Sequence, residues 1–115
     1  SRFDAPSPAS FSAPIVRDLL RRELAFDGVV ISDSIGMQAL RGAYPRADVL
    51  ARTFAADVDI ILARDTTDAI GLRDELAALV RSGAIAMADV DRGAARVLEL
   101  KRRHGLLPTT KGASR

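Results

Sequence analysis

Residues 26–34 read FDGVVISDS, and this segment indicates the fold class of the chain. Its centre, Val29-Val30-Ile31, is β-branched throughout and has no polar alternation, which is typical of a strand buried on both faces in a parallel sheet. A polar segment, Ser32-Asp33-Ser34, follows at the C-terminal end of this run. The segment therefore predicts a strand of an α/β fold with polar side chains after its carboxyl end.

Helical patterns flank this strand and a second strand follows it. Apolar side chains recur at three- and four-residue spacing before the strand, where Ser12 is the expected N-cap. The residues after it predict further helices and one more apolar strand, with Thr67 or Asp68 capping the helix that follows. The expected elements are a helix over 14–24, the strand at 29–31, helices over 35–40 and 45–56, a strand over 58–63, and helices over 68–80 and 87–103.

This order of elements indicates parallel β/α architecture, because each helical crossover returns the chain to start a strand in the same direction. Only two convincing strands are present, and so small a parallel sheet leaves both of its edges unpaired. We therefore expect a fragment of a larger β/α fold, or a chain that completes its sheet with another chain.

Composition narrows the possible chemistry. The chain has 115 residues, 48% of them apolar and 28% charged, which fits one modest globular domain or part of one. It has no cysteine, and His104 is its single histidine, so disulfides, thiolate zinc sites and multi-histidine metal sites are excluded. No apolar run approaches the roughly 18 residues of a membrane span. No signal peptide is visible in the sequence, whose first residue is Ser1 and not Met. These features favour a cytoplasmic location.

The basic residues are concentrated at the end of the chain. Five of the 17 basic groups lie in residues 101–115, and removing them leaves 12 basic against 15 acidic groups in residues 1–100. A basic end without interleaved aromatic residues is typical of a solvated terminus. We therefore expect no nucleic-acid partner, and we treat residues 108–115 as a basic tail.

Asp33 is the principal candidate for chemistry. Loops after the carboxyl ends of parallel strands line the ligand sites of β/α folds. A carboxylate there can act as a nucleophile, bind a metal, accept phosphate, hydrogen-bond a sugar or simply cap the next helix. An aspartyl-phosphate receiver is disfavoured, because the preceding acidic pair and a clear downstream Lys are missing. Position alone leaves the other roles open.

Other polar residues have simpler explanations. Asp65 and Asp68 follow the second strand and are expected to cap a helix. Asp59 lies in an otherwise apolar strand and needs a partner if it is buried, so its expected role is structural. His104 falls at a helix C-terminus, where the helix dipole favours a cation. Met37 is expected to be a core contact, although its spacing of four residues from Asp33 could also bring it to the same pocket.

The run FDGVVISDSIGM, residues 26–37, resembles the signature of glycoside hydrolase family 3, most closely its bacterial β-N-acetylglucosaminidase branch. In that branch a strand ends in Ser-Asp, and a Met follows four residues after the Asp. The resemblance extends over residues 1–107 and includes the helix before residue 26, the second strand and the closing helices. It implies that residues 1–107 form the C-terminal part of a (β/α)8 TIM-type barrel of the family.

The resemblance also implies a function. Asp33 would be the nucleophile of a retaining glycosidase that releases terminal β-linked N-acetylglucosamine or glucose through a glycosyl-enzyme intermediate, with no metal or organic cofactor. Met37 would line the substrate pocket. The partners would be a carbohydrate substrate and the remainder of the barrel, or a second copy through the open sheet edges.

The chain departs from the family pattern in several places. The family's acid/base residue, a His from earlier strands or a Glu from beyond the barrel, has no counterpart here, and His104 does not match it. Asp57 stands where the family often has Gly, and Ser34 stands where a second Asp is frequent. We therefore expect the isolated 115-residue chain to be inactive. The alternative is a non-catalytic, truncated β/α module that acts in assembly or binding.

Overall fold

The computed structural model of the chain describes residues 8–35 and 44–108. Its elements are η1 (Ala9–Phe11), η2 (Pro14–Glu23), β1 (Ile31–Ser34), α1 (Arg46–Ala55), β2 (Ile60–Leu62), α2 (Thr66–Arg81) and α3 (Met87–Arg103). Met37 and most of the helix expected over 35–40 lie outside the described residues. Within the described ranges, no helix combines the length and the apolar character that a bilayer crossing requires.

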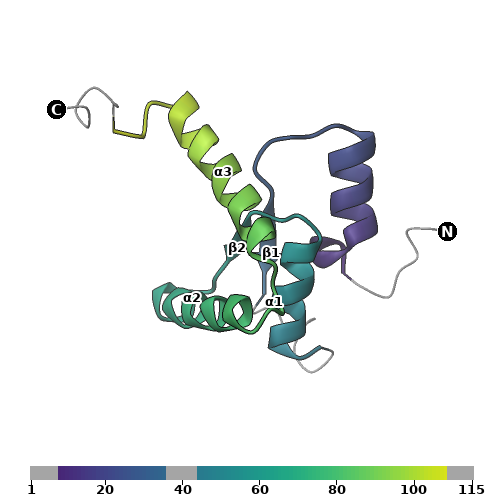
Figure 1. The fold of residues 1–115 in the computed structure, drawn as a ribbon, viewed down its shortest axis with the longest axis vertical. Coiled ribbons are helices and arrows are strands. Elements are labelled where there is room, and N and C mark those ends of the chain that lie inside the picture. The colour runs from purple at the N-terminus through teal and green to yellow at the C-terminus, as the bar shows by residue number, and fades with distance from the viewer. Residues whose placement is uncertain (1–7, 36–43, 109–115) are drawn as a thin grey trace.

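The parallel β/α architecture expected from the sequence is confirmed. β1 and β2 pair in parallel and form the two-stranded sheet of the described residues. Figure 1 shows the two strands side by side at the centre, with the helices arranged around them and α3 extending away toward the C-terminus. Helix η2 precedes β1. Helix α1 lies between β1 and β2, so a helical crossover joins the two parallel strands.

Strand β1 begins and ends later than the sequence predicts. The expected strand was 29–31, followed by a polar segment, whereas the observed strand includes Ser32, Asp33 and Ser34. Val30 is still held to the second strand, because its carbonyl oxygen accepts hydrogen bonds from the N–H groups of Asp59 and Ile60. The polar residues can continue the strand because one of them pairs across it: the Ser32 hydroxyl accepts a hydrogen bond from Leu62.

The expectation that this strand is buried on both faces is wrong for the described residues. Ile31 is 58% exposed and Asp33 is exposed, whereas Ser32 between them is buried. Ile31 and Asp33 are thus open to solvent while Ser32 is covered, and the register shift at Ser32 and Asp33 interrupts the regular alternation of side chains. The sheet of the described residues is therefore open to solvent at Ile31, Asp33 and Leu62.

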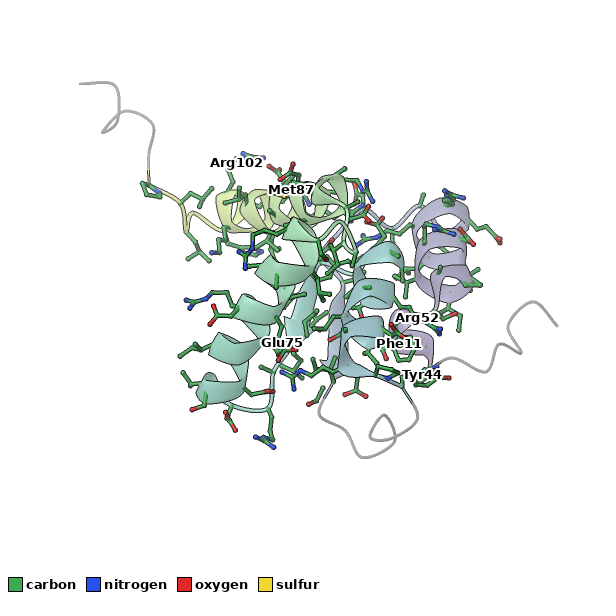
Figure 2. The ribbon with its side chains drawn as sticks, turned by 60° about the horizontal axis from the view of Figure 1, so that its bottom comes forward. Phe11, Tyr44, Arg52, Glu75, Met87 and Arg102 are labelled. Carbon is green, nitrogen blue, oxygen red and sulfur yellow. The ribbon has the colours of Figure 1, made fainter. Side chains whose placement is uncertain are left out.

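Two small clusters attach the helices to the covered side. Val16 of η2 packs with Ala56 and Val58, and Val30 contacts the same cluster. In the second cluster Phe11 packs against Val49 of α1, next to Ile35 and Tyr44. The rings of Phe11 and Tyr44 meet edge to face at 5.5 Å, and Arg52 lies over the Tyr44 ring, as Figure 2 shows.

The helix boundaries agree with the sequence predictions more closely than the helix caps do. The helix expected over 14–24 is observed as η2, with π-type hydrogen bonding, but its N-cap is Ala13 and no side chain caps it, so Ser12 does not have the expected role. The break after it includes Ala25, which adopts a φ of 54°. The cap of α2 is Asp65 rather than Thr67 or Asp68. Helix α3 spans 87–103 as predicted and is followed by Gly105 at a φ of 67°.

Candidate active site

Asp33 lies at the carboxyl end of β1, one residue before the strand ends. Its Oδ1 accepts a hydrogen bond of 2.7 Å from the N–H of Ser34, which limits rotation of the carboxylate. The side chain of Asp33 is exposed to solvent, as is that of Ile31. An aspartate in this position can meet a ligand that approaches the carboxyl edge of the sheet.

The strand that carries Asp33 has a shifted register against β2. Ile31 pairs with Ile60 and Ser34 pairs with Leu62, so Ser32 and Asp33 together face the single residue Ile61. Two residues opposite one is the arrangement of a β-bulge, which changes the direction of the side chains at that point. The Ser-Asp pair by itself carries no information about register, so the sequence does not predict a role for Ser32.

Of the acidic residues after β2, Asp65 has the expected capping role, and Asp68 lies in the first turn of α2. Asp65 accepts a hydrogen bond from the N–H of Asp68 at 2.8 Å, and Asp68 accepts one from the N–H of Arg64 at 3.1 Å. The backbone hydrogen bond from Asp68 lowers the pKa of Asp65, and that from Arg64 lowers the pKa of Asp68. Arg46 of α1 also binds Asp68 and Glu75, which ties α1 to the start of α2. These carboxylates accept hydrogen bonds at the start of α2, so Asp33 remains the candidate catalytic residue.

At the opposite, amino-terminal end of the two strands lies an ion-pair cluster formed by Arg21, Asp57, Asp59 and Arg96. Asp59 is the centre of the cluster: its Oδ2 accepts hydrogen bonds from Arg21 at 2.6 Å and from the Val30 N–H at 2.9 Å, and its Oδ1 accepts one from Arg96 at 2.8 Å. Its side chain is only 1% exposed. The structural role expected for Asp59 is confirmed, and its partners come from η2 and α3.

Asp57 explains one departure from the family pattern. Its φ is 70°, in the left-handed region that glycine adopts with least strain. Its carboxylate receives two hydrogen bonds from Arg96, at 2.8 and 2.9 Å. These bonds lower the pKa of Asp57, and Asp57 in turn raises the pKa of Arg96. Asp57 thus adopts a left-handed backbone conformation that suits glycine, and its carboxylate binds Arg96 of α3.

The remaining candidate residues stay apart from Asp33. His104 is the exposed C-cap residue of α3, as the sequence predicts, and its N–H donates to the Leu100 carbonyl. Met37 lies outside the described residues. Within residues 8–35 and 44–108, no three His, Asp or Glu side chains gather as a metal site.

Comparison with known proteins identifies the family. Residues 1–100 match the family model described as the glycosyl hydrolase family 3 N terminal domain. A β-N-acetylglucosaminidase/β-glucosidase of Cellulomonas fimi is 33% identical over 100 residues, an alignment that covers 86% of this chain and 17% of that protein. The match includes the segment around Asp33 and both strands.

Solved structures agree with this match. The family 3 β-N-acetylglucosaminidase of Paenibacillus sp. str. FPU-7 superimposes with a TM-score of 0.78 at 32% identity, over 89% of this chain and 20% of that one. The β-N-acetylhexosaminidase of Beutenbergia cavernae DSM 12333 gives a TM-score of 0.72 at 36% identity, over 84% of this chain and 29% of that one. The chain thus spans less than a third of each of these relatives, and its two strands and helices are part of a (β/α)8-type barrel. The chain belongs to glycosyl hydrolase family 3.

Proposed function

We propose that this chain supplies the catalytic nucleophile, Asp33, to a retaining glycoside hydrolase that cleaves terminal β-linked N-acetylglucosamine or glucose. The observation that carries the proposal is the position of Asp33 at the carboxyl end of β1, where its side chain is exposed. Barrel enzymes bind their substrates at this end of their strands. The names of the matched relatives, a β-N-acetylglucosaminidase/β-glucosidase and a β-N-acetylhexosaminidase, support the substrate class.

The reaction proceeds in two steps. The Asp33 carboxylate attacks the anomeric carbon while an acid protonates the leaving glycosidic oxygen, so the glycosidic bond breaks as the ester to Asp33 forms. Water, deprotonated by the same acid/base group, then attacks the anomeric carbon and releases Asp33. The hydrogen bond from Ser34 to Oδ1 holds the carboxylate through both steps. The acid/base comes from a part of the enzyme outside this chain, about 5 to 5.5 Å from the Asp33 carboxylate as retention requires.

The test uses the complete barrel enzyme that contains this segment. Asp33→Asn removes the nucleophilic charge and preserves the size of the side chain, so turnover of an aryl N-acetylglucosaminide should almost vanish while the fold is kept. A slow fluorinated glycoside should label Asp33, which peptide mapping would locate. Asp65→Asn is the matched control, because Asp65 is an exposed capping residue near the same edge. Its turnover should stay close to that of the unmodified enzyme.

Two results would refute the assignment. The first is an Asp33→Asn enzyme that keeps most of its activity. The second is a label found on Asp4, Asp65 or Asp68 instead of Asp33.

A second candidate function is assembly without catalysis. It is favoured by the open face of the sheet, where Ile31 of β1 and Leu62 of β2 are 58% and 48% exposed. A module of this kind would bind the remainder of a barrel, or a second copy of itself, through the edges of β1 and β2. Mixing the chain with a separately expressed polypeptide that carries the other barrel strands tests both functions. Restored turnover that depends on Asp33 supports the catalytic role, and a stable but inactive complex supports assembly alone.

A further inference from the structure

β1 has a shifted register against β2 at Ser32 and Asp33, in the two-against-one arrangement of a β-bulge. In a regular ladder, one residue of β1 would face one residue of β2. Here Ser32 and Asp33 share the position opposite Ile61, between the pairs Ile31–Ile60 and Ser34–Leu62. An inserted residue disrupts the ladder locally and turns the bulged strand, and such bulges often lie next to active sites. The carboxylate direction of Asp33 therefore depends on what holds the bulge.

The Ser32 hydroxyl connects the two sides of this bulge. Its Oγ accepts a hydrogen bond of 3.1 Å from the N–H of Leu62 in β2. The same hydroxyl donates a hydrogen bond of 2.8 Å to the carbonyl oxygen of Asp33. The Ser32 hydroxyl thus takes the place of a backbone acceptor for the Leu62 N–H. It also holds the peptide group between Asp33 and Ser34 through the Asp33 carbonyl.

Burial makes these two hydrogen bonds effective. Ser32 is only 6% exposed, whereas its neighbour Asp33 is exposed. Removal of the hydroxyl would leave the Leu62 N–H and the Asp33 carbonyl without this partner in a region from which water is largely excluded. Because Ser32 is buried and its hydroxyl makes both of these hydrogen bonds, we expect its effect on catalysis to pass through Asp33.

We infer that Ser32 is a positioning residue for the glycosidase reaction: its hydroxyl holds the β-bulge that directs the Asp33 carboxylate toward the anomeric carbon. The inference rests on the proposed function of Asp33 as the nucleophile. Displacement of a reacting group by about 1 Å can lower the rate by about 100-fold. The loss should appear in kcat, because the contacts that bind the sugar are unchanged.

The experiment compares Ser32→Ala and Ser32→Thr in the complete barrel enzyme. The concentration of active sites is measured by titration with a slow fluorinated glycoside, so unfolded protein does not lower the measured kcat. Ser32→Ala should lower kcat per active site by about 10- to 100-fold with KM nearly unchanged. Ser32→Thr keeps the hydroxyl and should recover most of the rate.

Thr53→Val is the matched control. Thr53 is 1% exposed, and its hydroxyl donates a 2.7 Å hydrogen bond to the Val49 carbonyl within α1, away from the bulge. Its loss should lower stability and leave kcat per active site unchanged. If Ser32→Ala does not fold, Ser32→Cys provides the test, because a thiol has a similar size and forms weaker hydrogen bonds. Its kcat should also fall.

The outcomes separate this inference from the proposed function. If Asp33→Asn is inactive but the Ser32 variants keep the full kcat, the positioning role is wrong and Asp33 remains the nucleophile. If Ser32→Ala and Thr53→Val lower kcat equally, the Ser32 hydroxyl is a general structural group and the inference is again wrong. If Asp33→Asn stays active, the proposed function itself fails.

Discussion

Arg21 of η2 and Asp59, which directly precedes β2, form an ion pair of 2.6 Å between side chains that are 6% and 1% exposed. The pair joins residues 38 positions apart in the sequence. Because Asp59 also accepts a hydrogen bond from the Val30 N–H, it connects η2 to the start of β1 as well. The carboxyl ends of the strands carry the candidate chemistry, and this pair holds their opposite ends.

Removal of one member of this pair should therefore be costly. Arg21→Met leaves Asp59 buried without its closest cation, and loss of one partner of a buried pair destabilises by about 3 to 5 kcal/mol. Arg22→Met is the control, because Arg22 is 70% exposed and pairs with Asp18 at 3.3 Å. An exposed pair of this kind contributes about 0 to 1 kcal/mol. Urea unfolding at pH 7 measures both changes, and equal losses would contradict the role given to the buried pair.

The left-handed backbone of Asp57 allows a second test of the cluster. Asp57→Ala and Asp57→Gly both remove the carboxylate that binds Arg96, but they differ in the strain of a φ of 70°. Because a Cβ in this region costs roughly 1 to 2 kcal/mol, Asp57→Gly should be less destabilised than Asp57→Ala by about that amount. Thermal unfolding of the two variants at one protein concentration gives the difference. An alanine variant as stable as the glycine variant would show that the turn is not strained.

The lowered pKa of Asp57 makes stability depend on pH. The guanidinium of Arg96 holds the pKa of this carboxyl below its usual value. A group whose pKa is lower in the folded state stabilises the fold above its unfolded pKa of about 3.9, and this contribution disappears as pH falls through the folded value. The free energy of unfolding should therefore decrease as pH is lowered below about 4.

Asp57→Asn isolates this contribution, because it keeps the size of the side chain and cannot titrate. Its unfolding free energy should fall less steeply over the same pH range than that of the unmodified chain. The lowered pKa values of Asp65, Asp68 and Glu99 act in the same direction, and they remain in both proteins. Identical pH profiles for the two proteins would exclude a contribution from Asp57.

The open sheet face should cause the isolated chain to associate. Unpaired edges of β1 and β2 expose backbone donors and acceptors, next to the exposed Ile31 and Leu62. Analytical ultracentrifugation at micromolar concentration should show oligomers, and Ile31→Lys should shift them toward monomer. Leu106→Lys is the control, because Leu106 is 70% exposed but follows α3, outside the sheet. A compact monomer with cooperative unfolding would contradict this prediction.

The isolated 115-residue chain should not hydrolyse glycosides. The reaction needs an acid to protonate the leaving oxygen as well as the Asp33 nucleophile, and absence of acid/base assistance alone lowers rates by about 10²- to 10⁴-fold. Absence of the sugar-binding parts of the barrel should lower them further. Release of an aryl group from an aryl N-acetylglucosaminide by the purified chain, abolished by Asp33→Ala, would disprove this prediction.

The sequence alone determined the order of helices and parallel strands, the boundaries of α3 and the position of Asp33 at the carboxyl end of a strand. These features are visible because apolar periodicity and capping residues act within a few positions along the chain. The apolar neighbours of Asp59 also predict that it needs a partner if it is buried. The sequence could not identify that partner from local pattern, because Arg21 and Arg96 are brought to Asp59 only when η2 and α3 pack against the strands.

Only the tertiary structure decided the register of β1 against β2. Whether Ser32 and Asp33 face one residue or two depends on the pairing with β2, and no local pattern encodes that pairing. The observed strand also includes the Ser-Asp-Ser segment, because the Ser32 hydroxyl accepts a hydrogen bond from the Leu62 N–H across the sheet. The exposure of Ile31 likewise follows from which faces the helices cover. Hydrogen bonds and burial between distant segments exist only in the packed chain, and they determine where the Asp33 carboxylate points.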